Sequence, residues 1–248
     1  MKPKHILIDC DGTLFNNNLK ETDFAAFCAI REYCLKAEKY NLPKISLCTG
    51  RPQPFVVPVL NLLGAVWPGI PSVIESGAFL YFPYDNELVK NEYTSYSLKS
   101  WYSLKQRILD FAAEYNCKSV PGKEVMISLF PPAGMNSKEL NSLARETFKD
   151  VEELETVYSS LCVDFTPKGV DKAIGIKYLC SKMEIEPEEI LGIGDSNNDL
   201  SMLKIVGFAA CPNNAFEKVK ELCEYVSPHP FTRGVADILS SYGEGDSI

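Results

Sequence analysis

The sequence predicts an α/β protein: a Rossmann-like parallel sheet core into which a small α+β segment is inserted. In the first and last thirds of the 248-residue chain, short apolar runs alternate with helical stretches, as in βα units on a parallel sheet. The middle third instead combines alternating strands with two long amphipathic helices, which is typical of helices packed on an antiparallel sheet. With 46% hydrophobic and 23% charged residues, the composition is that of an ordinary globular protein.

Each element of the first third follows from its local pattern. Runs of consecutive apolar residues predict buried strands, apolar residues spaced by three or four predict helices, and Pro43 ends the first helix. Residues 83–86 (Pro-Tyr-Asp-Asn) predict the turn of a hairpin. The predicted elements are a strand at 5–8, a helix at 20–40, a strand at 45–48, a helix at 53–63, a strand at 72–75 and hairpin arms at 77–82 and 88–90.

The rest of the chain is interpreted in the same way. The middle third contains a helix at 98–115, a strand at 124–130, a helix at 137–149, capped by Asn136 or Ser137, and hairpin arms at 156–158 and 161–165. The last third contains helices at 170–183, 197–204 and 214–223, strands at 190–193 and 207–210, and a closing segment at 234–242. We therefore expect a core of residues 1–83 and 166–248 and an inserted α+β domain of residues 84–165.

Charge and cysteine content narrow the class of protein. Asp and Glu number 33 against 25 Lys and Arg, a net charge of -8, and no basic cluster exists to bind nucleic acid. The nine cysteines form no CxxC pair, which argues against a zinc site or a disulfide framework and suits a reducing cytosol. No stretch resembles a signal peptide or a membrane span. We expect a cytoplasmic protein with neither a nucleic acid nor a membrane as partner.

Two acidic clusters follow two different predicted buried strands. Asp9 and Asp11 come after the strand at 5–8, and Asp195 and Asp199 come after the strand at 190–193. Because ligand sites in open α/β sheets form beyond the carboxyl ends of the strands, the four carboxylates are expected to converge. They would repel one another unless a cation joined them, and oxygen ligands favour Mg²⁺. Either cluster alone could be an ordinary turn, since Asp favours turns.

A candidate anion site lies at the same edge of the sheet. Thr49, Gly50 and Arg51 end the strand at 45–48 and offer a hydroxyl, a flexible backbone amide and a guanidinium, which suit phosphate. Lys172, near the start of a predicted helix, could balance the carboxylates and bind phosphate. The alternatives are a turn with a surface arginine and an exposed lysine.

Together these motifs resemble those of the haloacid dehalogenase (HAD) superfamily of phosphatases. Asp9 to Thr13 match DxDGT, Thr49 ends the next strand, Lys172 precedes Asp195 by 23 residues, and Gly194 to Asp199 match GDxxND. The resemblance covers the whole chain outside the insert. The position of the insert, between the second and third motifs, resembles the Cof-type subclass (IIB). Its short two-helix form is similar to that of archaeal-type phosphoglycolate phosphatases and sucrose-phosphate phosphatases.

The resemblance implies a HAD-like core, Mg²⁺ as cofactor and a role for each motif residue. Asp9 would attack phosphorus to form an aspartyl-phosphate, and Asp11 would protonate the leaving oxygen and then accept a proton from water. The implied metal ligands are Asp9, Asp11, Asp195 and Asp199. The implied phosphate- and substrate-binding residues are Thr49, Gly50, Arg51, Lys172 and Asn198.

The insert is expected to be a cap that roofs the site and selects the substrate. Strand alternation divides its side chains between two faces. Those expected to face the cap helices are Val125, Ile127, Leu129, Leu161, Val163 and Phe165. Those expected on the roof, where some could instead meet only solvent, are Met126, Ser128, Phe130, Cys162 and Asp164. We expect Met126, Ser128 and Asp164 to determine specificity.

The leading hypothesis is a Mg²⁺-dependent phosphatase for a small phosphorylated metabolite, such as phosphoglycolate or a sugar phosphate, acting as a monomer or homodimer. A phosphomutase is one alternative, because phosphomannomutases share the first motif and the cap position, although their fourth motif is longer and glycine-rich. A non-catalytic binding protein on the same fold is the other, although no nucleophile or metal ligand is missing here.

Overall fold

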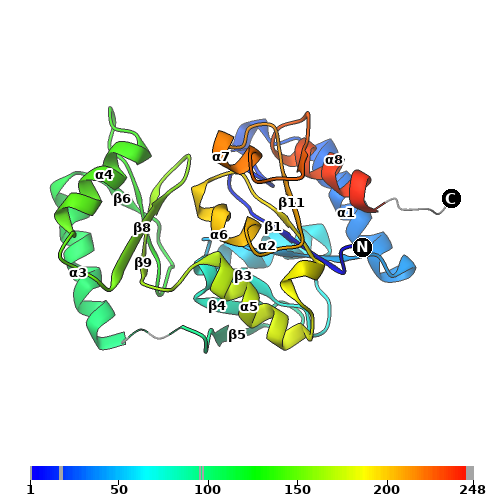
Figure 1. Ribbon diagram of the computed structural model, residues 1–248, viewed down its shortest axis with the longest axis horizontal. Helices are drawn as coiled ribbons and strands as arrows, with labels where there is room; N and C mark the ends of the chain where they lie inside the picture. Colours follow the sequence, from blue (N-terminus) through cyan, green and yellow to red (C-terminus); the bar gives the residue numbers. More distant parts are fainter. Residues whose placement is uncertain (1, 17–18, 95, 97, 244–248) are drawn as a thin grey trace.

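A five-stranded parallel sheet forms one half of the molecule (Figure 1). The computed structural model describes residues 2–16, 19–94, 96 and 98–243. Across the sheet the strand order is β12-β11-β10-β1-β2, and every neighbouring pair is parallel. The strands are β1 (His5–Ile8), β2 (Lys44–Leu47), β10 (Ile190–Ile193), β11 (Phe208–Cys211) and β12 (Tyr225–Val226). The α/β fold class with a parallel sheet is therefore confirmed.

The strand order determines where a ligand site can form. From β1 the chain runs to β2 on one side, whereas β10 and the later strands lie on the other side of β1. Such a reversal leaves a crevice beyond the carboxyl ends of the strands that flank it, and ligands bind in that crevice. The loops after β1 and β10 are therefore the expected position of the site.

Helices cover both faces of the sheet because its central strands are apolar on both sides. Ile6 and Ile8 pack into one cluster with the helices of one face, and Leu7 packs into a second cluster with the helices of the other. The first face carries α1 (Phe24–Tyr40), α2 (Gln53–Leu63) and α8 (Phe231–Gly243). The second carries α5 (Lys172–Met183), α6 (Leu200–Leu203) and α7 (Glu217–Lys220).

A second sheet continues beside the edge of the first. The antiparallel strands β3 (Ser72–Ile74), β4 (Phe79–Phe82) and β5 (Glu87–Lys90) form it, and a parallel bridge from Cys48 to Val73 joins it to the end of β2. The predicted hairpin at 83–86 connects β4 to β5. Because β5 pairs with β4, this hairpin stays with the core, although the expected insert began at residue 84.

A separate α+β layer, from α3 to β9, forms the other half of the molecule (Figure 1). Its antiparallel sheet has the order β6-β7-β9-β8. The strands are β6 (Lys118–Ser119), β7 (Ile127–Phe130), β8 (Leu154–Tyr158) and β9 (Val163–Pro167), and the helices are α3 (Leu98–Glu114) and α4 (Ser137–Thr147). Aromatic packing between Phe111, Phe148 and Phe165, with ring centroids 5.5 to 6.1 Å apart, fastens both helices to the sheet.

Some element boundaries differ from the prediction for identifiable reasons. The helix predicted at 20–40 begins at Phe24, because Asp23 caps it by accepting a hydrogen bond from the backbone N–H of Ala26. The helix predicted at 214–223 shrinks to α7, because Asn214 and Phe216 hydrogen-bond to backbone carbonyls of the loops after β1 and β10. Among the described residues, no helix is both long and apolar enough to cross a membrane.

Candidate active site

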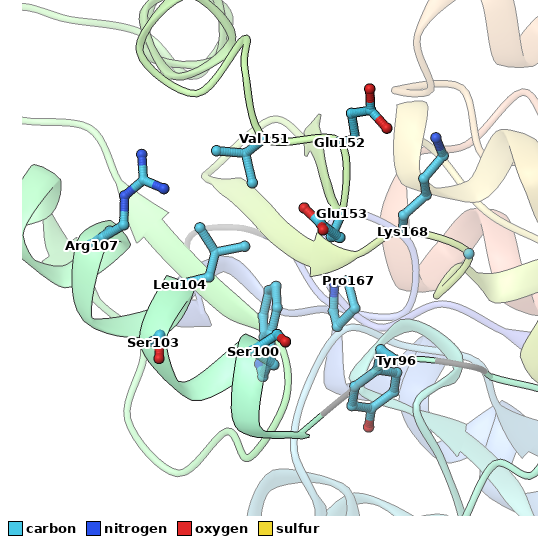
Figure 2. A pocket seen from close by; sticks show the side chains of 12 residues that line it. Tyr96, Ser100, Ser103, Leu104, Arg107, Val151, Glu152, Glu153, Pro167 and Lys168 are labelled. Atoms are coloured by element: carbon cyan, nitrogen blue, oxygen red, sulfur yellow. The ribbon is translucent and has the colours of Figure 1, made fainter.

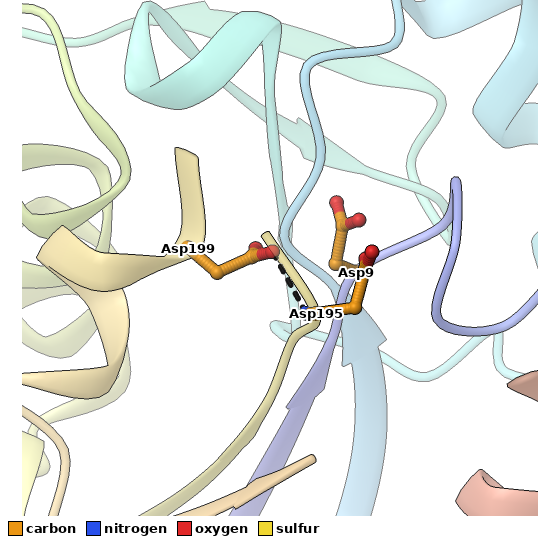
Figure 3. A group of neighbouring side chains, drawn as sticks. All are labelled: Asp9, Asp195 and Asp199. Carbon is orange, nitrogen blue, oxygen red and sulfur yellow. Dashed lines mark hydrogen bonds between the residues drawn. The ribbon is translucent and has the colours of Figure 1, made fainter. Parts of the chain in front are cut away.

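Three carboxylates meet where β1 and β10 end (Figure 3). Asp9 follows β1 directly, and Asp195 and Asp199 lie in the loop and short turn after β10. One oxygen from each of the three lies within 4.8 Å of the others, and each residue is at most 2% exposed. The two acidic clusters of the sequence thus form one site.

Lys172 lies between these carboxylates. It is the first residue of α5, whose start is fixed by the Asp171 side chain, and its ammonium donates to Asp9 Oδ1 and to Asp199 Oδ1, both at 2.6 Å. Burial lowers the pKa of Lys172, but the charges of Asp199 and Asp9 outweigh burial, so its pKa lies well above the usual value. The ammonium therefore stays charged and offsets part of the negative charge of two buried acids.

The same surroundings act on the acids. Burial raises the pKa of Asp9 to about 8; Lys172 opposes the rise and the Asp199 charge adds to it. Burial and the charges of Asp199 and Asp9 raise the pKa of Asp195 well above its usual value. Acids that hold protons this firmly will become fully charged only beside additional positive charge.

The other carboxylate oxygens of the cluster differ in the hydrogen bonds that they accept. Asp199 Oδ2 accepts the backbone N–H groups of Asp195 and Ser196, both at 3.0 Å, so both of its oxygens have donors. Asp195 Oδ1 accepts from the Thr13 hydroxyl at 2.8 Å. Within the described residues, Asp9 Oδ2 and Asp195 Oδ2 accept no hydrogen bond, and these two oxygens are open to a ligand.

This donor set fits a hard divalent cation. Two open carboxylate oxygens from the ends of adjacent strands are the ligands that Mg²⁺ prefers, with water filling the other positions. Gly12 makes their approach possible: it has a φ of +86°, and a Cβ there would lie 2.4 Å from Asp195 Oδ2. The glycine of the first motif thus lets the two acidic loops touch.

Arg51 and Asp11 form an ion pair beside the cluster. The guanidinium donates from Nε and Nη2 to the two Asp11 oxygens, both at 2.6 Å, and stacks over the Phe55 ring at 4.6 Å. Thr49 is 1% exposed, and its hydroxyl accepts the Arg51 backbone N–H at 3.1 Å. Asp11 therefore stands apart from the three clustered acids, and its side chain would have to leave Arg51 to act elsewhere.

A small cavity joins these groups to the α+β layer. The sheet edge contributes Asp9, Asp11, Thr49, Gly50, Arg51 and Asn198. The α+β layer contributes Val120, Lys123, Ser128, Phe130, Ser159, Leu161, Cys162 and Asp164. Its volume is about 30 Å³, room for about two water molecules. The space between the two halves is therefore narrow and lined by charges of both signs.

The roof of the cavity consists largely of the residues that were expected there. Ser128, Phe130, Cys162 and Asp164 line the cavity, and a Cβ on Gly50 would lie 3.1 Å from Met126 Cε. The residues that pack against the helices are Val125, Ile127, Leu129, Val163 and Phe165. Leu161 was expected to face the helices but lines the cavity, because it lies in the turn before β9, where strand alternation does not apply.

Two residues that contribute to the site were not among those predicted for it. Lys123 lies in an irregular loop between β6 and β7, where no periodicity indicates which way a side chain points. Glu75 is 2% exposed, and its carboxylate accepts the backbone N–H groups of residues 124–126 at 2.8 to 3.0 Å. It thereby ties the core to the α+β layer, a long-range contact that local pattern does not predict.

A larger cavity lies elsewhere, beside α3 and the segments that connect the two halves (Figure 2). Its volume is about 820 Å³, and its lining includes Tyr96, Arg107, Glu153 and Lys168. Lys168, the lysine four positions before Lys172, belongs to this cavity. Because Lys172, and not Lys168, contacts the clustered acids, this larger cavity is separate from the carboxylate site.

Clustered acids with a lysine between them, at the switch point of a parallel sheet, can hold a metal ion and an anionic ligand side by side. A family model for haloacid dehalogenase-like hydrolases matches residues 108–239. A phosphoglycolate phosphatase of Thermoplasma volcanium is 30% identical over 247 residues, covering 96% of this chain and 98% of its own. One from Methanobrevibacter smithii is 28% identical over 239 residues, covering 96% and 97%. The chain belongs to the haloacid dehalogenase-like hydrolases.

Solved structures share the fold of the entire chain. A Thermoplasma acidophilum protein superposes with a TM-score of 0.76 at 22% identity, covering 98% of this chain and 99% of its own. A sucrose-phosphatase from Synechocystis, in complex with sucrose and phosphate, gives 0.72 at 18% identity and covers 98% of both chains. With the phosphatase relatives, these findings identify the protein as a phosphatase of this family, whose members generally use a divalent metal.

Proposed function

We propose that the protein is a Mg²⁺-dependent phosphatase that hydrolyses a small phosphorylated metabolite through an aspartyl-phosphate on Asp9. The observation that supports this most is the meeting of Asp9, Asp195 and Lys172 at one edge of the sheet. A carboxylate with an open oxygen, a second open acidic ligand and a fixed cation are what in-line phosphoryl transfer requires.

Asp9 is the proposed nucleophile. One of its carboxylate oxygens would form a bond to phosphorus while the ester bond to the leaving oxygen breaks, and Asp11 would give that oxygen a proton. Water would then attack the aspartyl-phosphate, with Asp11 taking its proton, which releases inorganic phosphate and restores both carboxyl groups. To do this, Asp11 exchanges its bond to Arg51 for one to the leaving oxygen.

The other carboxylate oxygen of Asp9 and Oδ2 of Asp195 would hold Mg²⁺, together with the backbone carbonyl of Asp11. When bound, the metal supplies positive charge that lets an anionic nucleophile approach an anionic phosphate. Asp199 would act indirectly, by holding Lys172 and the backbone of the Asp195 loop. The proposed ligands of the phosphoryl oxygens are Thr49, Gly50, Lys172 and Asn198.

The α+β layer is proposed to act as the cap that selects the substrate. The cavity beneath it, about 30 Å³, has room for only about two water molecules, so the cap would have to move away to admit any phosphate ester. Relatives that match nearly the whole chain are named phosphoglycolate phosphatases, which favours phosphoglycolate over a sugar phosphate as the substrate. All these residues come from one chain, so a monomer would suffice for activity.

The proposal predicts that Asp9→Asn abolishes turnover while the protein stays folded. The amide keeps the shape of the side chain but is a far weaker nucleophile. Release of inorganic phosphate from phosphoglycolate and p-nitrophenyl phosphate is measured with and without Mg²⁺, and circular dichroism checks the fold. The matched control is Asp85→Asn, in the exposed β4–β5 turn, which should keep wild-type rates. A folded Asp9→Asn protein that still released phosphate would contradict the proposal, and isomerisation without phosphate release would indicate a mutase.

A further inference from the structure

We propose that Lys123 recognises a second negative charge on the substrate, so that the preferred substrates are short phosphate monoesters with a carboxylate on the leaving group. This inference rests on the proposed phosphatase function and goes beyond it, because it assigns the specificity of that reaction to one residue of the α+β layer.

Lys123 differs from the other cations around the site in its partners. Lys172 is paired with Asp9 and Asp199, and Arg51 is paired with Asp11. In the part of the chain that the structure describes, no carboxylate oxygen lies within 4.0 Å of Lys123 Nζ. A charged group that lines a narrow cavity without an opposite charge in contact is suited to an anionic ligand.

The Lys123 ammonium is held in a defined position by the roof. It donates to Ser128 Oγ at 2.5 Å and lies 3.5 Å from Met126 Sδ. Ser128 in turn donates its own hydroxyl hydrogen to Asp164 Oδ1, which leaves the Ser128 lone pairs to face Lys123. Because an ammonium has three hydrogens and the thioether is a weak acceptor, at least one hydrogen stays available to a ligand.

The backbone that carries Lys123 is fixed as well. The Glu75 carboxylate accepts the N–H groups of the next three residues, 124–126, and Lys105 Nζ donates to the carbonyls of Lys123 and Glu124 at 3.3 and 3.2 Å. Glu75 is therefore a positioning residue for Lys123. A rigidly placed donor distinguishes ligands better than a mobile one, because little entropy is lost on binding.

Lys123 shares one cavity with the residues that are proposed to act on the phosphate. Lys123, Arg51, Asp9 and Asp11 all line the same space. That space, about 30 Å³, has room for only about two water molecules, so the α+β layer has to move away to admit a phosphate ester. A substrate whose phosphate lies beside Asp9 then has its leaving group next to Lys123, and a carboxylate on a short leaving group supplies the opposite charge.

The test compares two esters of equal length that differ in charge. Phosphoglycolate carries a carboxylate where 2-hydroxyethyl phosphate carries a neutral CH₂OH group. In Lys123→Met, kcat/KM for phosphoglycolate should fall about 10- to 100-fold, mainly through KM, as expected for a lost charge-assisted hydrogen bond. The kcat/KM for 2-hydroxyethyl phosphate should change less than about 3-fold. Lys123→Arg should restore part of the preference, and Lys118→Met, on exposed β6, should change neither ester.

Each outcome has a separate meaning. Equal losses on both esters in Lys123→Met would make Lys123 a structural brace and overturn the inference. A wild-type enzyme that prefers 2-hydroxyethyl phosphate, or treats the two esters alike, would also overturn it, yet would leave the phosphatase proposal intact. A wild-type protein that releases phosphate from neither ester, nor from p-nitrophenyl phosphate with Mg²⁺, would overturn the proposed function and the inference together.

Discussion

Glu75 adopts a backbone conformation that few glutamates do. Its φ is +44° and that of Ser76 is +53°, both in the left-handed region that costs an ordinary residue conformational energy. The turn points the Glu75 carboxylate out of the core and into the backbone of the α+β layer. Three hydrogen bonds to the buried carboxylate offset the conformational energy of this turn. The strained residues therefore lie where the two halves of the molecule join.

Replacing Glu75 therefore tests the junction. Glu75→Gln should lower the free energy of unfolding by about 1 to 3 kcal/mol, because the amide has only one oxygen to accept what were three charge-assisted bonds. Urea unfolding measures the loss, and hydrogen exchange at residues 124–126 should accelerate more than exchange in β1. Glu87→Gln, on exposed β5, is the matched control and should be neutral. Unchanged exchange at 124–126 would show that the contact does not hold the layer.

At the scale of the element, β1 and β2 share one buried polar contact inside an otherwise apolar sheet. His5 Nε2 lies 2.8 Å from Ser46 Oγ, and His5 is 1% exposed. Burial, with a smaller contribution from Lys44, lowers the pKa of His5 from 6.5 to about 3. The folded protein thus keeps this imidazole neutral at pH values where the unfolded chain takes up a proton.

The difference between the pKa of His5 in the folded and the unfolded protein determines how stability changes with pH. Between pH 6.5 and 3 the unfolded state binds the extra proton, so the contribution of His5 to stability is lost as the pH falls, by up to about 1.4 kcal/mol per pH unit. His5→Gln has no such proton, so the variant should gain stability relative to wild type between pH 7 and pH 5 in urea unfolding. Ser46→Ala keeps the imidazole and should keep the wild-type pH dependence. A pH-independent difference between wild type and His5→Gln would contradict this.

Elements with strong local patterns were predicted well, and those determined by distant contacts were not. The strand at 190–193 and the helix at 53–63 match β10 and α2, because apolar runs and turn residues define them locally. The segment at 214–223 has helical spacing, yet Asn214 donates to the Gly12 carbonyl instead of starting a helix. The strands β6 and β12 have two residues each, too few to show a period.

In the candidate site, too, residues that follow from local pattern were predicted and residues placed by distant contacts were not. The four motifs were found because each follows a predicted strand or starts a predicted helix, so topology alone brings them to one edge. Lys123 was missed because an irregular loop places it. The pairing of Asp11 with Arg51 depends on the side-chain conformations of two loops, which spacing does not encode.

At the scale of the whole molecule, the two halves contribute different groups to the site. The parallel sheet carries the acids and Lys172, and the α+β layer carries Lys123, Ser128 and Asp164 above them. Beyond the Glu75 contact, Asn197 donates to the Tyr158 carbonyl at 3.3 Å across the junction. Few polar contacts therefore hold the layer over the site, which suits a cap that must admit and release a ligand.

Removal of divalent metal should leave the protein folded. Lys172 is paired with Asp9 and Asp199, and the raised pKa values of Asp9 and Asp195 let these acids keep a proton when no metal is bound, so treatment with EDTA should change the thermal midpoint by no more than a few degrees while it abolishes turnover. Lys172→Met should be destabilised by about 3 to 5 kcal/mol, because buried charges lose their partner, and Mg²⁺ should then raise its midpoint. Unfolding of the wild-type protein in EDTA would contradict this.

The two ion pairs of Lys172 also bear on whether the chain must bind a metal ion before it can fold. A site whose acids depended on a metal would tie folding on the ribosome to the local supply of that ion. Here the polypeptide brings its own counter-charge, so folding can finish first and the ion can be taken up, exchanged or lost later. Folding of the chain is thereby separated from uptake of a metal ion.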